Sequence, residues 1–422
     1  MALHNGHDEK IQGEKPMAIV IHGGGIGLGI VRSLGEAGIK CIVLYNSDEE
    51  IAIHSKYVVE KVHIRNFLDK DEIRDVLLAN ADRWKGSILM ASNDEQLFAV
   101  SYYRKQLARH YIIPLASHKY IQMLLDKSLT YKLAERAGID YPKTHYPKSM
   151  KDAMKLKDKL MFPCLVKPCE RHWFYEAFQE KLFEVKTFEE MVEKFRLCLD
   201  RKIEVMITEK IPGDDMHLFL CKMYIDSTGQ TDFAFIMQKL RQAPPNYGVG
   251  RVVRSVVNND VKMLGKKLIE HMPGFVGVIQ PEFKYDSRDG KYKLMEINAR
   301  PTLFLSLEKK LGIDIPLMIY KDYVENTRWK VDRYRTNIYW IHLYFDLFNI
   351  FSKRRKLEHY SFWQYIKPYF MEKAWCIESW NDPKPMIKHW QIKFSDYRRW
   401  LAKKMKTAFT SGPTVPVASP AD

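Results

Sequence analysis

The stretch KYKLMEINARP, residues 291–301, has the alternating pattern of a β-strand with one polar face. Successive side chains of a strand point to opposite faces of its sheet, so Glu296 and Asn298 share one face. Met295 and Ile297 occupy the other face, which is apolar. A carboxylate and a carboxamide therefore stand side by side where a core strand would carry apolar residues.

This strand has a partner just upstream in VGVIQPEFKY, residues 276–285. The residues between the two runs, DSRDG, are turn formers, which predicts a hairpin centred near Arg288 or Asp289. That register brings Glu282 opposite Glu296 or close to it. Two carboxylates and an amide oxygen are ligands that suit Mg²⁺. A half-exposed sheet face with ordinary polar residues is the alternative interpretation.

The composition is that of a soluble globular protein with two or three domains. The chain has 422 residues, of which 46% are hydrophobic and 28% are charged. No apolar run approaches the roughly 20 residues that span a bilayer, and the N-terminal residues are too polar for a signal peptide. The six cysteines lack zinc-ligand and CxxC spacings. We therefore expect a reduced, cytoplasmic protein with buried thiols.

Positive charge is concentrated toward the C-terminus. The formal net charge is +15, and residues 328–406 contain 18 Lys and Arg against 7 Asp and Glu, an excess of +11. The same segment holds seven of the nine tryptophans. Such a balance favours anionic partners: phosphates, anionic lipid, an acidic polymer or nucleic acid.

Strand and helix patterns predict an N-terminal α/β region and a later α+β region. The first alternates strands and helices around a glycine-rich turn, which is typical of a Rossmann-like, doubly wound domain. The second holds several strands and closes shortly after the hairpin. The expected divisions are a disordered leader (1–16), the Rossmann-like domain (17–115), the α+β region (116–325, with a small lobe at about 140–210 and a large lobe at about 211–325), a mainly helical basic extension (326–407) and a disordered tail (408–422).

The run HGGGIGLGI, residues 22–30, is a partial dinucleotide fingerprint. Gly25 and Gly27 supply two of the glycines that let backbone amides approach a phosphate at a helix N-terminus. The third glycine position is occupied by Ile30. A structural tight turn is the alternative interpretation. The fingerprint also raises a nicotinamide-dependent oxidoreductase as an alternative function.

The order of five further motifs is more specific than any one of them. The motifs are DKSLTYKLAERAGIDYPKT, FPCLVKP, ITEKIPGDD, QPEFKYD and MEINARP. Together they resemble the ATP-grasp superfamily over about residues 17–325. The GGGIGLGIVRSLGEAGI and QKLRQAPPNYGVG stretches are similar to the carboxylate-amine ligases related to D-aspartate ligase and to the large chain of carbamoyl-phosphate synthase. The resemblance implies a Rossmann-like pre-ATP-grasp domain followed by an ATP-grasp fold whose two lobes hold ATP.

The resemblance also implies which residues would bind the nucleotide. Lys127 and Lys167 match the two lysines that bind ATP phosphates. Glu209 opens the hinge whose backbone, through Lys210 and Ile211, meets the adenine.

Further matches concern the ribose, the cations and the transferred phosphate. Asp214 or Asp215 falls near the ribose carboxylate of the family. Arg300 matches the arginine that contacts the transferred phosphate or the acyl phosphate. The metal ligands implied for one or two Mg²⁺ ions, with Mn²⁺ as an alternative, are Glu282, Glu296 and Asn298.

One departure from the family follows Lys167. The family often has a glycine-rich loop there, whereas CERHWFYEAFQEKLFEV, residues 169–185, contains no glycine. Lys181 is the candidate for a second lysine on the return strand of this loop. Arg171 and His172 would either compensate for the missing glycines or belong to the acceptor site.

A loop between the hinge and the hairpin is the candidate substrate face. QKLRQAPPNYGVGRVVRSV, residues 238–256, is rich in cations that would bind a carboxylate or would simply be solvated. Arg241 and Arg254 are the preferred substrate-binding pair among the four cations Lys239, Arg241, Arg251 and Arg254.

The implied function is an ATP- and Mg-dependent ligase that activates a carboxylate as an acyl phosphate and joins it to an amine. Phosphoryl transfer needs positioning and charge neutralisation more than a covalent nucleophile, which agrees with a site of lysines, cations and one arginine. Small, anionic carboxylate and amine substrates are the expected partners. A degenerate ATP-binding protein is an alternative, because the glycine-rich loop is missing.

The basic aromatic extension has three interpretations. It is a helical appendage that packs its aromatic rings on the catalytic domains, or a surface for an anionic membrane interface, where rings and cations act together. The second interpretation adds a membrane-surface scaffold as an alternative function and the inner face of the membrane as a location. Nucleic-acid binding ranks third, since no recognised module supports it.

Overall fold

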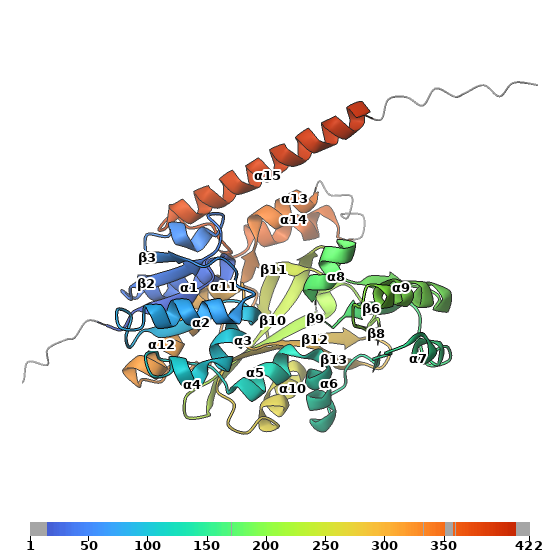
Figure 1. Cartoon of the computed structure of the whole chain (residues 1–422), viewed down its shortest axis with the longest axis horizontal. Helices are drawn as coiled ribbons and strands as arrows, with labels where there is room; N and C mark the ends of the chain where they lie inside the picture. The colour runs from blue at the N-terminus through green and yellow to red at the C-terminus, as the bar shows by residue number, and fades with distance from the viewer. Residues whose placement is uncertain (1–14, 170, 332, 351–357, 359, 411–422) are drawn as a thin grey trace, which may run out of the picture.

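The computed structural model describes residues 15–169, 171–331, 333–350, 358 and 360–410. Three β-sheets account for its architecture (Figure 1). They follow one another along the chain, and the last of them receives strands from the C-terminal segment. The leader and the tail expected to be disordered, residues 1–14 and 411–422, lie outside the described residues.

The first sheet is parallel, with strand order β3-β2-β1-β4. Its strands are β1 (Ala18–Ile21), β2 (Cys41–Tyr45), β3 (Val58–His63) and β4 (Ile88–Ala91). Strands β1 and β4 are buried throughout, as expected for a parallel sheet covered on both faces, whereas the edge strand β3 alternates half-buried and exposed residues. The helices here are α1 (Gly25–Glu36), η1 (Ile51–His54), α2 (Lys70–Ala79), α3 (Asp94–Tyr102) and α4 (Arg104–Leu107).

Two helices, α5 (His118–Leu125) and α6 (Lys127–Arg136), lead into a small antiparallel sheet with order β5-β8-β6-β7. Its elements are β5 (Thr144–His145), α7 (Met150–Met154), β6 (Cys164–Pro168), α8 (Arg171–Phe178), β7 (Phe183–Val185), α9 (Phe188–Asp200) and β8 (Val205–Glu209). One face packs on these helices through Val166, Phe195 and Ile207. By strand alternation, Lys167 points to the other face.

The third sheet has seven strands in the order β13-β12-β9-β10-β11-β14-β15. The elements that precede the C-terminal segment are η2 (Asp215–His217), β9 (Leu218–Ile225), β10 (Thr231–Ala243), β11 (Val249–Val256), α10 (Asn259–Glu270), β12 (Gly277–Asp286), β13 (Lys291–Asn298), α11 (Leu305–Lys310) and α12 (Ile315–Glu325). One face packs in a core with α5, α6 and α10. The opposite face, here called the inner face, shares a core with the N-terminal region, α11 and α12.

The C-terminal segment completes this sheet. Its elements are β14 (Tyr339–Ile341), α13 (Leu343–Ile350), α14 (Phe362–Phe370), β15 (Lys373–Trp375) and α15 (Pro383–Thr410). Strand β14 pairs antiparallel with β11, and β15 pairs parallel with β14. The helix α15 crosses the N-terminal region and then extends past the body of the protein (Figure 1). None of the described helices combines the length and the apolar character needed to traverse a bilayer.

Candidate functional site

The predicted hairpin is formed by β12 and β13, and its register places Glu282 directly opposite Glu296. Gln280 lies opposite Asn298 in the same ladder. A register shift beyond Glu282 separates this polar part of the hairpin from Phe283 and Leu294, which return to the core. The prediction that the two carboxylates face one another across the hairpin is therefore confirmed.

Glu282 is buried on the inner face, and its carboxylate accepts a hydrogen bond from the Lys239 ammonium at 2.6 Å. Burial raises the pKa of Glu282, the Lys239 charge opposes this, and the negative charge of nearby Glu296 raises the pKa further. The described residues assemble no group of three or more His, Cys, Asp or Glu side chains suited to a metal. Mg²⁺ commonly takes one or two carboxylates and completes its shell with substrate phosphates, so this donor set fits Mg²⁺ bound together with a nucleotide.

The two lysines expected at the phosphates lie on α6 and β6, and α6 contacts the hairpin. Tyr131 on α6 donates a hydrogen bond to the Met295 carbonyl at 3.3 Å. Burial raises the Tyr131 pKa, and the negative charge of Glu296 adds to the rise. Lys127 is four residues earlier on α6 and so lies on the same side of the helix. Burial raises the pKa of Cys169, which follows Lys167 at the end of β6, and the Lys127 charge opposes this rise. Lys127 therefore lies within electrostatic range of the end of β6 and on the helix that contacts the hairpin.

The predicted hinge joins the small sheet to the hairpin. Glu209 ends β8, and its carboxylate accepts hydrogen bonds from the Lys143 amide at 3.1 Å and from Arg288 at 2.5 Å. Lys210 pairs with Glu184 at 2.5 Å, and Ile211 is buried. The Glu209 side chain thus ties the hinge to the turn between β12 and β13.

The two candidate ribose carboxylates have different surroundings. Asp215 is 3% exposed and accepts hydrogen bonds from the Gln242 amide, the Gln242 side chain and the Asn246 amide at 2.7–2.9 Å. Asp214 is half-buried and accepts from the Met216 amide at 3.0 Å. We expected either acid to be able to hold a ribose. Asp215 instead binds Gln242 and Asn246 and so stabilises the turn after β10, which leaves Asp214 as the candidate.

The segment without glycines is helical. The helix α8 occupies residues 171–178, and the side chains of Arg171 and His172 lie outside the described residues. Lys181 follows this helix and donates a hydrogen bond to the Tyr247 carbonyl at 3.4 Å. Tyr247 in turn donates to Glu184 at 2.6 Å. The turn between β10 and β11, which contains Tyr247, therefore contacts the region of the small sheet through Lys181 and Glu184.

Arg300 lies just beyond β13 and ties the end of the hairpin to the N-terminal region. Its guanidinium binds both carboxylate oxygens of Asp94, at 2.7 and 3.2 Å, at the start of α3. The neighbouring Thr302 hydroxyl accepts from the fully buried Lys222 at 2.9 Å. Lys222 also forms an ion pair with the fully buried Glu308 at 3.4 Å. The sequence gives no sign of this support, because these partners are far apart along the chain.

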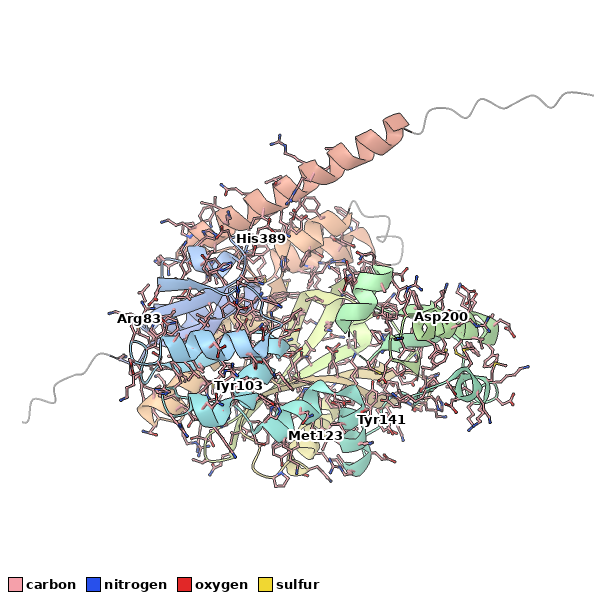
Figure 2. All side chains as sticks on the ribbon, viewed as in Figure 1. Arg83, Tyr103, Met123, Tyr141, Asp200 and His389 are labelled. Carbon is pink, nitrogen blue, oxygen red and sulfur yellow. The ribbon has the colours of Figure 1, made fainter. Side chains whose placement is uncertain are left out.

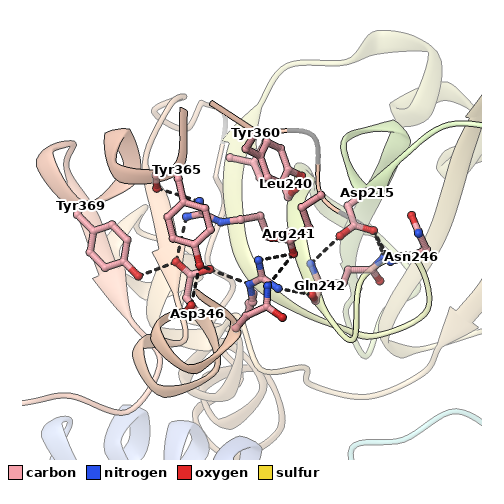
Figure 3. A network of polar contacts seen from close by, with 12 residues as sticks. Asp215, Leu240, Arg241, Gln242, Asn246, Asp346, Tyr360, Tyr365 and Tyr369 are labelled. Carbon is pink, nitrogen blue, oxygen red and sulfur yellow. Dashed lines mark hydrogen bonds and ion pairs between the residues drawn. The ribbon is translucent and has the colours of Figure 1, made fainter. Parts of the chain in front are cut away.

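The two arginines expected to bind substrate do not form a pair. Arg241 is 2% exposed and donates to Asp346 at 3.0 Å and to the Tyr365 carbonyl at 2.8 Å (Figure 3). Arg251, also buried, pairs with Asp346 at 2.7 Å. The prediction for Arg241 is wrong, because the C-terminal segment covers it.

Arg254 is on the wrong face of the sheet for the predicted role. It bonds Gln238, its partner across the β10–β11 ladder, at 2.8 and 3.0 Å. Strand alternation puts Gln238 and Arg254 on the face opposite to Lys239 and Glu282. The prediction that Arg254 binds substrate beside the metal ligands is therefore also wrong.

The glycine-rich turn before α1 is closed by a carboxylate of the protein. The Glu50 side chain accepts a hydrogen bond from the Gly23 amide and another from the Asn46 amide at 2.7 Å. A Cβ atom at Gly27 would approach the His22 carbonyl oxygen to 2.3 Å, so close packing requires glycine there. A negative group bonded to the turn disfavours a pyrophosphate, which favours the tight-turn interpretation over a dinucleotide site.

The chain is similar to known ligases and carboxylases over about three quarters of its length. No protein-family profile matches it. A D-aspartate ligase from Enterococcus faecium (strain Aus0004) is 26% identical over 332 residues, covering 73% of this chain and 77% of the relative.

Solved structures show the same fold. The biotin carboxylase domain of Hydrogenobacter thermophilus 2-oxoglutarate carboxylase, in complex with MgADP and bicarbonate, superposes with a TM-score of 0.62 at 16% identity, covering 78% of this chain and 74% of that one. An L-amino acid ligase from Bacillus licheniformis superposes with a TM-score of 0.57 at 16% identity, covering 74% and 75%.

Proposed function

From the premise that the chain is a homologue of D-aspartate ligase with the ATP-grasp fold of carboxylate-amine ligases, we propose that it is an ATP- and Mg-dependent ligase. It joins a carboxylate to an amine through a C–N bond and releases ADP and phosphate. The observation that carries this function is Glu282 facing Glu296 on the inner face, with the lysine-bearing helix α6 packed against β13.

We assign the nucleotide site to residues of both lobes. Glu282, Glu296 and Asn298 would hold Mg²⁺, which supplies charge neutralisation at the β- and γ-phosphates. Lys127 and Lys167 would bind phosphate oxygens from the side of the small sheet. The backbone at Lys210 and Ile211 would meet the adenine, and Asp214 rather than Asp215 would hold the ribose. Lys181 would order the turn that closes over the phosphates, through Tyr247.

The reaction proceeds in two balanced steps. A carboxylate oxygen of the acid attacks the γ-phosphorus of ATP, the bond to the β-phosphate oxygen breaks, and an acyl phosphate and ADP result. The amine then attacks the acyl carbon, loses a proton, and displaces phosphate. Arg300, held in a fixed orientation by Asp94, stabilises the charge on the transferred phosphoryl group.

The substrates are proposed by class. The D-aspartate ligase homologue makes an acidic amino acid the first carboxylate to try. We also propose that residues 17–115 act as a Rossmann-like pre-ATP-grasp domain, that residues 326–407 are an extension of the ATP-grasp fold, and that the protein acts in the cytoplasm. The parallel sheet of β1–β4 and the two strands that β14 and β15 add to the large sheet support this division.

The function is tested by measuring ADP release from Mg-ATP with pools of amino acids, sugar acids and fatty acids, each with and without added amines. We expect release that depends on one acid pool and falls by at least about 100-fold in Glu296→Ala, since metal-held charge is worth several kcal/mol in such a transition state. Glu193→Ala, which removes an exposed carboxylate on α9, is the matched control and should retain full activity.

Three other outcomes would separate the alternatives. ATP binding without turnover in any pool would favour a degenerate ATP-binding protein. Equal ADP release by Glu296→Ala and wild type would contradict the assigned metal site. Tight NAD binding would favour the nicotinamide-dependent oxidoreductase as the function. The Glu50 carboxylate at the glycine turn disfavours that alternative.

A further inference from the structure

The exposed Phe and Trp side chains of the described residues all fall between residues 362 and 394. They lie on α14, just before α15 and in the first half of α15. Their exposed fractions range from 57% to 90%, for Phe362, Trp363, Phe370, Trp380 and Phe394. Aromatic side chains this exposed are unusual on a protein surface unless they meet a partner.

Polar contacts on the buried side of α14 fix the orientation of this helix. Its aromatic side therefore faces solvent. Tyr365 and Pro368 are buried, and the Tyr365 hydroxyl donates to the Asp346 carbonyl at 2.7 Å. The Tyr369 hydroxyl donates to the Asp346 carboxylate at 2.5 Å. Phe362 and Phe370 are eight residues apart and therefore lie on one side of this helix. Because α14 is fixed in this orientation, these rings remain in solvent.

The first half of α15 is likewise fixed to the body. Asp382, which precedes the helix, binds Arg32 at 3.1 Å and Ser55 at 2.8 Å in the N-terminal region. His389 is buried and lies where α15 crosses the body (Figure 2). The Tyr397 ring lies 6.0 Å from Phe348 on α13. Beyond this point the helix extends past the body (Figure 1).

Cations accompany the exposed rings. Lys367 on α14 and Lys384 and Arg398 on α15 are exposed, and no ion pair joins them to an acid of the described chain. In sequence, the last turns of α15 add Lys403, Lys404 and Lys406. Exposed rings with surrounding lysines and arginines are typical of helices that lie in the interface of an anionic bilayer, where rings enter the headgroup region and cations meet lipid charge.

We propose that the surface formed by α14, Trp380 and α15, here called the interfacial surface, docks the protein on an anionic membrane. The rings stand on convex helices, and a bilayer accepts such a shape without a complementary pocket. A membrane also explains the length of α15 beyond the body, since an in-plane helix needs no protein neighbour. The docking is independent of the ligase reaction and would place that reaction at the membrane surface.

The test is sedimentation of the full-length protein with vesicles of phosphatidylcholine alone and of phosphatidylcholine with equimolar phosphatidylglycerol. We expect binding to the anionic vesicles and little binding to the neutral ones. The double variant Trp363→Ser/Phe370→Ser should weaken binding at least about tenfold, because two large rings leave the interface. Lys384→Gln/Arg398→Gln should weaken it roughly fivefold for each cation removed.

Two controls test whether any loss of vesicle binding is specific to the interfacial surface. Met154→Ser/Met161→Ser removes two exposed apolar side chains from the small lobe and should leave vesicle binding unchanged. Circular dichroism and thermal unfolding of each variant verify the fold. Wild-type protein that stays in the supernatant with anionic vesicles would overturn the proposal, as would equal binding by the Trp363/Phe370 variant. Binding to single-stranded DNA that survives this variant and displaces the vesicles would assign the cations to nucleic acid instead.

Discussion

Arg241 and Arg251 are buried, charged residues that contact the C-terminal segment of the protein and do not face a substrate. Arg241 meets the buried Asp346 carboxylate (Figure 3). Arg251 meets the same carboxylate and also Glu358, at 2.5 Å. Removal of one partner of such a pair leaves an uncompensated buried charge, which typically costs 3–5 kcal/mol. These arginines therefore stabilise the attachment of the C-terminal segment to β10 and β11.

We predict that Arg251→Ala lowers the free energy of unfolding by about 3–5 kcal/mol. Arg254→Ala, three residues further along β11 on the opposite face and bonded to Gln238, should change it by less than about 1 kcal/mol. Urea unfolding followed by tryptophan fluorescence measures both. Similar midpoints for the two variants would contradict the buried network.

Some site residues could be placed from the sequence and others could not. Glu282, Glu296 and their register followed from strand alternation and a turn of five residues, because all the information is local. Arg241 could not be placed in the same way. A register shift interrupts alternation between Lys239 and Arg241, and its partner Asp346 is 105 residues away.

At the scale of elements, β14 and β15 are the features that the sequence did not predict. Each has three residues, and their aromatic sequences YWI and KAW carry no alternation long enough to indicate a strand. Strand β14 pairs with β11, which lies more than 80 residues earlier. Long-range pairing of this kind is set by tertiary contacts, which override local propensity.

Two buried histidines meet beside α13: His342, just before that helix, and His389 on α15. Burial lowers the pKa of His342 to about 3 and that of His389 to about 4, and the rings lie 5.7 Å apart. Below the unfolded value of 6.5, the unfolded chain binds protons that the folded chain does not, so stability falls as pH falls toward 4. At pH 5.5 the two groups together cost about 3 kcal/mol relative to pH 8.

We predict that His389→Phe removes about half of this loss between pH 8 and pH 5.5. The urea midpoint of the transition reported by the C-terminal tryptophans measures it. The exposed His271→Gln is the control and should keep the wild-type dependence on pH. A pH dependence unchanged by His389→Phe would show that this pair does not govern the acid sensitivity of the segment.

At the scale of the molecule, two contacts among the described residues join the region of the small sheet to the large sheet. The Tyr247–Glu184 contact lies beside β7, and the Arg288–Glu209 contact lies at the hinge. The order of motifs along the chain indicated the ATP-grasp fold, and the comparisons over about three quarters of the chain agree with it. How the lobes touch could not be predicted, because these contacts join loops that carry no pattern of their own.

In the proposed reaction, the carboxylate substrate is activated by phosphorylation. The most direct measurement uses the acid that supports ADP release, labelled with ¹⁸O in its carboxylate, together with Mg-ATP and the amine. The attacking carboxylate oxygen remains on the phosphoryl group when the amine displaces it, so we predict one ¹⁸O atom in the phosphate released per amide formed. Unlabelled phosphate accompanying amide formation would contradict the acyl phosphate route and the assignment of the site to a ligase of this kind.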